Sequence, residues 1–439
     1  MKKLKLFSLA WPIFIETALF MLLGFVDVFV LSQYNDLAAS AVNTANQSVS
    51  IVTIVFTVIS GASAVLISQY LGADKKDNAS RIAALSIFFN FAFGIIISVL
   101  LFFFNEEILV FIGAEGTLLE YSSEYLEIVG SFLFLQAVLA AMSVVVRNHG
   151  MTKISMYVTV GMNILNTTLD IILVPHMGVK GVAIATSLSR VLGTIVLAYI
   201  LFTKIESIKI FKMLRPFPFK DTKDIVKVGV PSALESALYN ISQLVITSIV
   251  LNCLTEPELI AKTYIQSITM FVYIFAVAIG QASQIITGHL VGAGEFDKAY
   301  KNGLKAYRNA LIMVISIALL SALFRGYIPR IFTDNPDVLL LAGNILIFNV
   351  FLEFGRTTNL VVLACLRGAG DVYFPTVCAI FSNWIVSVFG SYLLAVVCGF
   401  GIYGLFVALA LDEIVRGALM LIRFKSGKWR TKALVKKEV

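Results

Sequence analysis

Twelve long apolar blocks divide this chain, and they decide what it can fold into. Three of them, residues 82–104, 154–174 and 182–202, each carry at most one ionised side chain. An α-helix needs about 20 apolar residues to cross the roughly 30 Å hydrocarbon layer of a bilayer. The blocks are continuously apolar, whereas the strands of a membrane barrel alternate over about ten residues. They therefore predict an all-α integral membrane protein.

The twelve predicted membrane-spanning helices cover residues 7–32, 45–70, 81–104, 121–146, 154–175, 181–203, 225–252, 261–287, 306–328, 338–364, 373–397 and 403–422. Several are longer than a bilayer requires, so tilted helices or interfacial ends are expected. Composition agrees, because 59% of the residues are hydrophobic and 14% are charged. The first block is interpreted as a retained helix rather than a signal peptide, since it is long and contains two carboxylates.

The basic residues are distributed unevenly between the two sides of the membrane. With both termini placed in the cytoplasm, the inner segments hold 27 Lys and Arg residues and the outer segments hold 4. This bias follows the positive-inside rule and predicts an integral protein of the cytoplasmic membrane with both termini inside. The net charge of +7 is then explained by topology and by contact with anionic lipid, without a nucleic-acid partner.

The chain repeats itself at an offset of about 220 residues. Pro12 and Glu16 correspond to Pro231 and Glu235, and further matches pair Arg147-x-x-Gly150 with Arg367-x-x-Gly370, and Gly178-x-x-Gly181 with Gly401-x-x-Gly404. Because six helices per half is an even number, the halves are parallel repeats. We predict a first six-helix lobe at 1–203, a cytoplasmic linker at 204–224, a second lobe at 225–422 and a basic cytoplasmic tail at 423–439.

Parallel repeats of this kind favour a secondary transporter, because two lobes can rock around a central cavity. A channel more often shows a short filter-like loop between helices, which the sequence lacks. An enzyme needs a catalytic cluster, but the three histidines are scattered and no metal spacing appears. We therefore expect neither an enzyme nor a resident cofactor, with Na⁺ or H⁺ as coupling ion.

The ordered set of motifs resembles the multidrug and toxic compound extrusion (MATE) transporters. The motifs that carry the resemblance span nearly the whole chain: Trp11-Pro12 with Glu16, Gly24-x-x-Asp27, Gln69-Tyr70-Leu71-Gly72-Ala73, Asn163-Ile164-Leu165-Asn166 with Asp170, Gly178-Val179-Lys180-Gly181 with Thr186, and Leu366-Arg367-Gly368-Ala369-Gly370-Asp371. The resemblance implies two six-helix lobes forming a V, and export of cationic amphiphilic small molecules in exchange for Na⁺ or H⁺ by a protein expected to be monomeric. The alternative is a lipid-linked oligosaccharide flippase of the same superfold.

Ionisable side chains within the apolar blocks are candidates for function, because each costs roughly 2.5–3.5 kcal/mol at the bilayer centre. Asn163, Asn166 and Asp170 share one helix face, and Asp27 lies well inside the first helix. Carboxylate and amide oxygens suit Na⁺, and two nearby carboxylates can hold a proton. We predict a coupling-ion site at these four residues and Thr186. The alternative is a polar clamp between helices.

Other polar and aromatic side chains have two open interpretations. Glu16 and Glu235 lie nearer the cytoplasmic ends, where they line the cavity mouth or serve as local structural partners. Phe271 and Tyr273 either offer ring faces to a cationic substrate or pack against lipid. The spacings Glu353-x-x-Arg356 and Asp412-x-x-x-Arg416 predict ion pairs within single helices. Arg190 has no acidic residue near it in the sequence.

Overall fold

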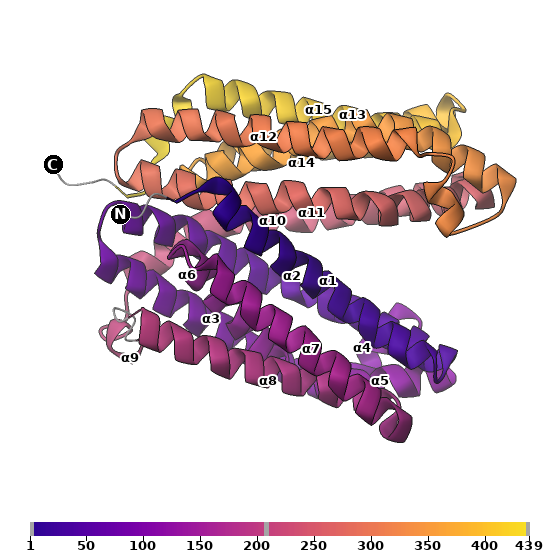
Figure 1. Ribbon diagram of the computed structural model, residues 1–439, viewed down its shortest axis with the longest axis horizontal. Coiled ribbons are helices and arrows are strands. Elements are labelled where there is room, and N and C mark those ends of the chain that lie inside the picture. Colours follow the sequence, from indigo (N-terminus) through magenta and orange to yellow (C-terminus); the bar gives the residue numbers. More distant parts are fainter. Residues whose placement is uncertain (1–3, 206–209, 436–439) are drawn as a thin grey trace. The chain divides into compact units, whose positions relative to one another are not determined.

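The structure is a computed structural model that describes residues 4–205 and 210–435 of the chain. Within these ranges the secondary structure is helical and contains no β-strand (Figure 1). Each of the twelve predicted blocks coincides with helix. The helices of the first half are α1 (Leu6–Ser32), α2 (Asp36–Gly72), α3 (Lys76–Phe103), α4 (Asn105–Ile112), α5 (Gly116–Ser131), α6 (Leu133–Asn148), α7 (Thr152–Met177), α8 (Val179–Lys204) and α9 (Ile210–Met213).

The second half repeats this order. Its elements are α10 (Phe219–Cys253), α11 (Glu256–Gly292), α12 (Phe296–Leu323), the 3₁₀ turn η1 (Ile328–Ile331), α13 (Pro336–Gly368), α14 (Tyr373–Ser382), the π-helical segments η2 (Asn383–Phe389) and η3 (Tyr392–Val397), α15 (Gly401–Lys425) and the 3₁₀ turn η4 (Lys428–Lys432). The all-α fold predicted from the apolar blocks is confirmed.

Ten of the described helices are long and apolar enough to cross a membrane. The pair α5 and α6 adds an eleventh if it forms one span, bent by 48°. The twelfth predicted block is α15, which carries three ionisable residues close together at Asp412, Glu413 and Arg416. These charges make α15 less apolar than the other spans, and they are paired inside the protein, as described below.

The chain folds into two compact units. The first lobe contains Trp11–Gly229, and the second lobe contains Met1–Ala10 and Val230–Val439. The units change at Trp11 and at Val230, each of which directly precedes one of the repeated prolines, Pro12 or Pro231. The core of the first lobe gathers apolar side chains such as Phe56 and Leu126. Part of the predicted linker, residues 206–209, lies outside the described residues.

The sixth helix of each half begins with the same glycine pattern, and the structure gives its physical reason. Gly178 and Gly401 both adopt a φ of +55°, where a side chain is strained. Gly181 and Gly404 meet the chain just before them: an added Cβ would lie 2.8 Å from the Leu173 carbonyl oxygen and 2.6 Å from the Leu394 carbonyl oxygen. Both halves therefore have a tight, closely packed turn at the start of the sixth helix, α8 in the first half and α15 in the second.

The beginning of the predicted basic tail is folded onto the second lobe. The ring of Trp429 is fully buried, stacks on Phe424, and donates from Nε1 to the Phe424 carbonyl oxygen at 2.8 Å. Arg430 contacts Asp297 at the start of α12 at 2.7 Å. Residues 436–439 of the tail lie outside the described residues. The described part of the tail thus contacts α12 and α15 of this lobe.

Candidate functional site

Four polar side chains from three helices meet inside the first lobe. Asp27 on α1 accepts a hydrogen bond from Thr186 Oγ1 on α8 at 3.0 Å. Asn166 and Asp170 lie one turn apart on α7, and the Asn166 amide is 3.3 Å from Thr186 Oγ1. None of the four is more than 1% exposed. The structure therefore brings four of the five residues of the predicted coupling-ion site into one cluster.

The Asn166 amide can hold the two carboxylates together. With its nitrogen facing them, it donates to Asp27 Oδ1 at 3.0 Å and to Asp170 Oδ2 at 3.3 Å, while its oxygen accepts from Thr186. The other carboxylate oxygen of Asp170, Oδ1, is buried and has no hydrogen-bond partner among the described residues. Burying such an oxygen without a partner is costly, and a proton or a small cation would relieve that cost.

A cavity of about 570 Å³ lies beside the cluster, within the first lobe. Asp27 forms part of its wall, together with apolar side chains such as Phe20 and Met162. Asn163, the fifth predicted site residue, also faces the cavity, but its amide donates to the Thr159 carbonyl oxygen at 2.9 Å. Asn163 is therefore a cavity residue, one turn from Asn166 and two turns from Asp170, rather than a member of the carboxylate cluster.

Arg190 is a residue of this cavity that sequence reasoning did not assign to it. Its side chain extends from α8, the residue is 9% exposed, and it interacts electrostatically with Tyr125 and Asp27. It forms no hydrogen bond or ion pair with any described residue, and Nη1 is buried without a partner. One signal was available in the sequence: Arg190 follows Thr186 by four residues, so both share a face of the helix.

The sequence also matches a known family along both halves. Residues 12–172 and 231–393 each match the MatE family model, so the same domain occurs once in each half of the chain. The chain belongs to the MatE family. The resemblance predicted from the motifs is thereby confirmed. Members of this family are integral membrane transporters and are not enzymes.

Named relatives of this MatE protein cover nearly its whole length. It is 35% identical to the uncharacterized transporter YisQ of Bacillus subtilis (strain 168), over 99% of this chain and 96% of YisQ. It is 28% identical to the probable multidrug resistance protein NorM of Thermotoga maritima, over 99% and 94% of the two chains. A crystal structure of MATE in the bent conformation shares the two-lobe fold with a TM-score of 0.87, at 21% identity over 96% and 95% of the chains.

In this MatE chain, Glu16 is engaged in local contacts away from the Asp27 cluster. Its Oε1 accepts from Ser155 Oγ at 2.7 Å, and its Oε2 lies 3.9 Å from Arg147 Nη1. The Glu16 side chain is almost fully buried. These contacts favour a structural role in which Glu16 ties α1 to α6 and α7.

Glu235 makes the corresponding contacts in the second lobe. Its Oε2 accepts from Arg367 Nη2 at 2.7 Å and from Thr376 Oγ1 at 3.0 Å. The repeat at about 220 residues therefore preserves an acid, an arginine and a hydroxyl at matching places in both lobes. We call each set an acid–arginine clamp: Glu16, Arg147 and Ser155 in the first lobe, and Glu235, Arg367 and Thr376 in the second.

The second lobe contains a buried ionic network on α13 and α15. Arg356 Nη1 lies 2.6 Å from Glu353 Oε1, and Arg416 Nη2 lies 2.5 Å from Asp412 Oδ2, which confirms both ion pairs predicted from spacing. Glu413 joins the pairs, because its Oε1 is 3.1 Å from Arg416 Nη2 and 4.0 Å from Arg356 Nε. The sequence interpretation did not single out Glu413, whose importance comes from contacts between two helices.

Of the two aromatic residues proposed for substrate contact, Tyr273 belongs to this network. The Arg356 guanidinium lies 5.8 Å from the centre of the Tyr273 ring, on α11. Phe271, two residues earlier on the same helix, is 65% exposed. The structure therefore places Tyr273 against a protein cation and Phe271 on the surface, so the two rings do not form one aromatic cage.

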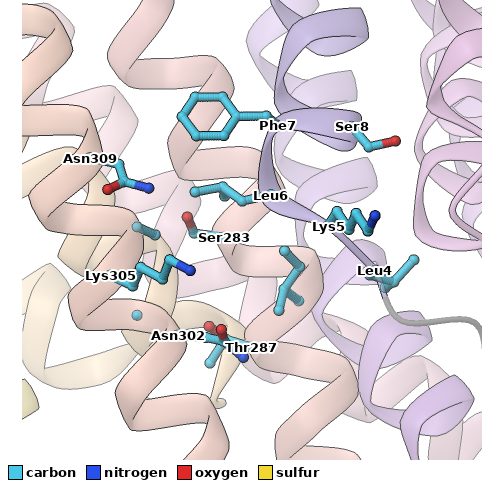
Figure 2. Close-up of a pocket in the computed structure, with 13 residues that line it drawn as sticks. Leu4, Lys5, Leu6, Phe7, Ser8, Ser283, Thr287, Asn302, Lys305 and Asn309 are labelled. Atoms are coloured by element: carbon cyan, nitrogen blue, oxygen red, sulfur yellow. The ribbon is translucent and has the colours of Figure 1, made fainter.

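A further pocket of about 440 Å³ lies within the second lobe, between the first residues of the chain and the helices α11 and α12 (Figure 2). Figure 2 shows Lys305 extending into this space from α12, with Asn309 and Ser283 nearby. No carboxylate is among the described residues that line this pocket. It therefore offers no cation site of the kind found beside Asp27.

Proposed function

We propose that this protein is a secondary active efflux antiporter, which exports amphiphilic small molecules in exchange for Na⁺ or H⁺. Its two lobes would rock to expose a cavity to alternate sides of the cytoplasmic membrane. Cationic amphiphiles are the substrates expected from the family resemblance. The proposed protein is a monomer, and both of its termini lie in the cytoplasm. The 27-to-4 distribution of Lys and Arg residues supports this orientation of the termini.

One observation carries the proposal: a buried carboxylate cluster with an unpaired oxygen adjoins a cavity large enough for a small molecule. Asp27 is shared between them, since it accepts from Thr186 in the cluster and also lines the cavity. An ion that binds at the cluster therefore changes the charge of the cavity wall. Coupling between two ligands requires such a shared element.

The Asn166 amide offers a way for the cluster to adapt to its ion. With the nitrogen turned inward it bridges the two carboxylates, as suits a site without a metal ion. With the oxygen turned inward it would add a ligand to the carboxylate oxygens, as suits Na⁺. A proton needs no such ligand, because one carboxyl can donate directly to the other.

The test is gradient-driven efflux from proteoliposomes, with an imposed Na⁺ or H⁺ gradient, one at a time. Asp27→Asn and Asp170→Asn should each reduce efflux at least about tenfold, because an amide preserves shape but cannot take up and release the ion. Asp334→Asn, at an exposed aspartate outside the site, is the matched control and should transport normally. Wild-type rates in both cluster variants would contradict the proposal.

A further inference from the structure

The pocket of the second lobe lies where two predicted spans meet the cytoplasmic side of the membrane (Figure 2). Its walls are the segment Leu4–Ser8, the C-terminal part of α11 and the N-terminal part of α12. Lys305 directly precedes the predicted span 306–328, and Thr287 is the last residue of the predicted span 261–287. The pocket is therefore at the depth where lipid headgroups border the hydrocarbon layer.

Three polar side chains on α12 face this pocket without a partner of their own. Asn302, Lys305 and Asn309 are spaced by three and four residues, so they lie on one face of the helix. No side chain of the three forms a hydrogen bond or ion pair with another described residue. Asn309 lies one turn inside the predicted span, where an amide without a partner is costly. A ligand that accepts hydrogen bonds would satisfy all three.

The charge of the pocket indicates that this ligand is an anion. Lys5, on the segment that faces α12, adds a second ammonium group to the wall. Lys5 and Lys305 are exposed and have no ion pair with a described residue, and no described residue of the wall carries a carboxylate. Lysine is a common phosphate ligand, and basic pockets between helices on the cytoplasmic side suit lipid headgroups.

The outer face of α12 provides a surface for the rest of a lipid. Ile312 and Leu319 follow Lys305 by 7 and 14 residues, about two and four turns, so they continue its face of the helix. Their side chains are 63% and 55% exposed. Fourteen residues rise by about 21 Å, which exceeds the roughly 15 Å hydrocarbon depth of one leaflet. A headgroup at Lys305 can therefore have its acyl chain along an apolar helix face, of which a free phosphate ion makes no use.

We propose that this pocket binds the phosphate group of an anionic phospholipid, with Lys305 as its principal cation and Asn302 and Asn309 as hydrogen-bond donors. The acyl chains lie outside the pocket, along α12. Such a lipid fastens the first residues of the chain to α11 and α12 within the second lobe. The inference goes beyond the proposed function and uses the proposed orientation only to assign the lipid to the inner leaflet.

The experiment compares two phospholipids with identical acyl chains: phosphatidylglycerol, which has a net negative charge, and phosphatidylcholine, whose phosphate is offset by a choline cation. Binding to the full-length protein in neutral detergent is measured by native mass spectrometry, which resolves each bound lipid. The wild-type protein should bind the first phosphatidylglycerol roughly tenfold or more tightly than the first phosphatidylcholine, as two lysines beside one anionic headgroup would produce.

Three variants separate the pocket from general attraction between the protein and anionic lipid. Lys305→Gln should weaken phosphatidylglycerol binding about fivefold and leave phosphatidylcholine binding nearly unchanged. Asn309→Leu removes a donor without changing the charge and should weaken phosphatidylglycerol binding about threefold. Lys428→Gln is the matched control, because it makes the same charge change at an exposed lysine of this lobe outside the pocket. It should keep the wild-type preference.

Thermal unfolding of each variant shows whether it is folded. If Lys305→Gln does not fold, Lys5→Gln takes its place, because Lys5 is exposed and precedes the first helix. Its loss of phosphatidylglycerol affinity should again exceed that of Lys428→Gln.

Inorganic phosphate distinguishes a lipid from a soluble ligand of the same chemistry. At the concentration of the lipid it should not displace phosphatidylglycerol, and displacement would overturn the assignment to lipid. Equal affinities of the wild type for the two lipids, or equal losses in Lys305→Gln and Lys428→Gln, would overturn it as well. These measurements use no ion gradient, so a lipid preference without gradient-driven efflux would keep this inference and reject the antiporter.

Discussion

The pair formed by Glu353 and Arg356 allows a quantitative test of how the second lobe is held together. Glu353 is completely buried and its Oε2 has no partner among the described residues, whereas the Arg356 side chain is 22% exposed. Removing one member of a buried ion pair costs about 3–5 kcal/mol, because it leaves the other charge uncompensated. Glu353→Gln should lie near the lower limit, about 3 kcal/mol, since Glu413 remains 4.0 Å from Arg356.

Arg356→Gln should cost more, about 5 kcal/mol, because it leaves the fully buried Glu353 without its cation. The double variant removes both charges, so its loss should be no greater than that of the worse single variant. The single losses add to about 8 kcal/mol and the double variant loses at most about 5 kcal/mol, so the coupling energy should be at least about 3 kcal/mol. The values are measured by unfolding the purified protein in mixed detergent micelles, with helical circular dichroism and the buried Trp429 as reporters. Single losses that add to within about 0.5 kcal/mol would refute the reasoning.

Two other predictions concern topology and backbone packing. In a protein without native cysteines, single cysteines at four positions on the predicted cytoplasmic side should resist membrane-impermeant labelling from outside the cell, and strong labelling of any one contradicts the charge-based orientation. These cysteines replace Lys75, Phe217, Lys301 and Lys428. Gly404→Ala should cost about 1–3 kcal/mol, because the new Cβ would meet the Leu394 carbonyl. Gly161→Ala, which has open space around it, is the control and should be neutral or stabilising by up to about 1 kcal/mol; equal losses in both would argue against close packing at Gly404.

The apolar blocks predicted every long helix, because length and continuous hydrophobicity are local properties of the sequence. Part of the first-lobe cluster was predictable for the same reason. Asn166 and Asp170 lie four residues apart, so the period of the α-helix alone places them on the same face. Asp27 could be added because a carboxylate deep in an apolar block needs a partner or a function. Thr186 was included in the predicted coupling-ion site because of the family resemblance.

Other parts of the site depend on contacts between distant segments, which one sequence does not reveal. Glu16 and Arg147 are far apart in the chain, and their contact was found only in the fold. Glu413 looked like an ordinary neighbour of Asp412, yet it connects two arginines on different helices. Arg190 appeared to lack a partner in the sequence, and it still lacks one in the structure, although now beside a cavity and Asp27.

The two lobes share their turns and their acid–arginine clamps, but they differ in buried charge. At the repeat offset of about 220 residues, the cluster residues Asp27, Asn166, Asp170 and Thr186 correspond to Ile246, Val386, Gly390 and Leu409. The second lobe thus has no copy of the cluster, and the carboxylates of its own network face arginines. A carboxylate cluster free of fixed cations within ion-pair distance is found, among the described residues, in the first lobe.

This asymmetry bears on the energetics of transport. If this cluster takes up one monovalent cation per cycle, a tenfold ion gradient without a membrane potential supports at most a tenfold gradient of an exported molecule that has no net charge. Such an exchange moves one net positive charge inward. It is therefore electrogenic, and the membrane potential adds about 2.3 kcal/mol for every 100 mV. Export should then accelerate when the interior is made negative, even with equal ion concentrations on both sides.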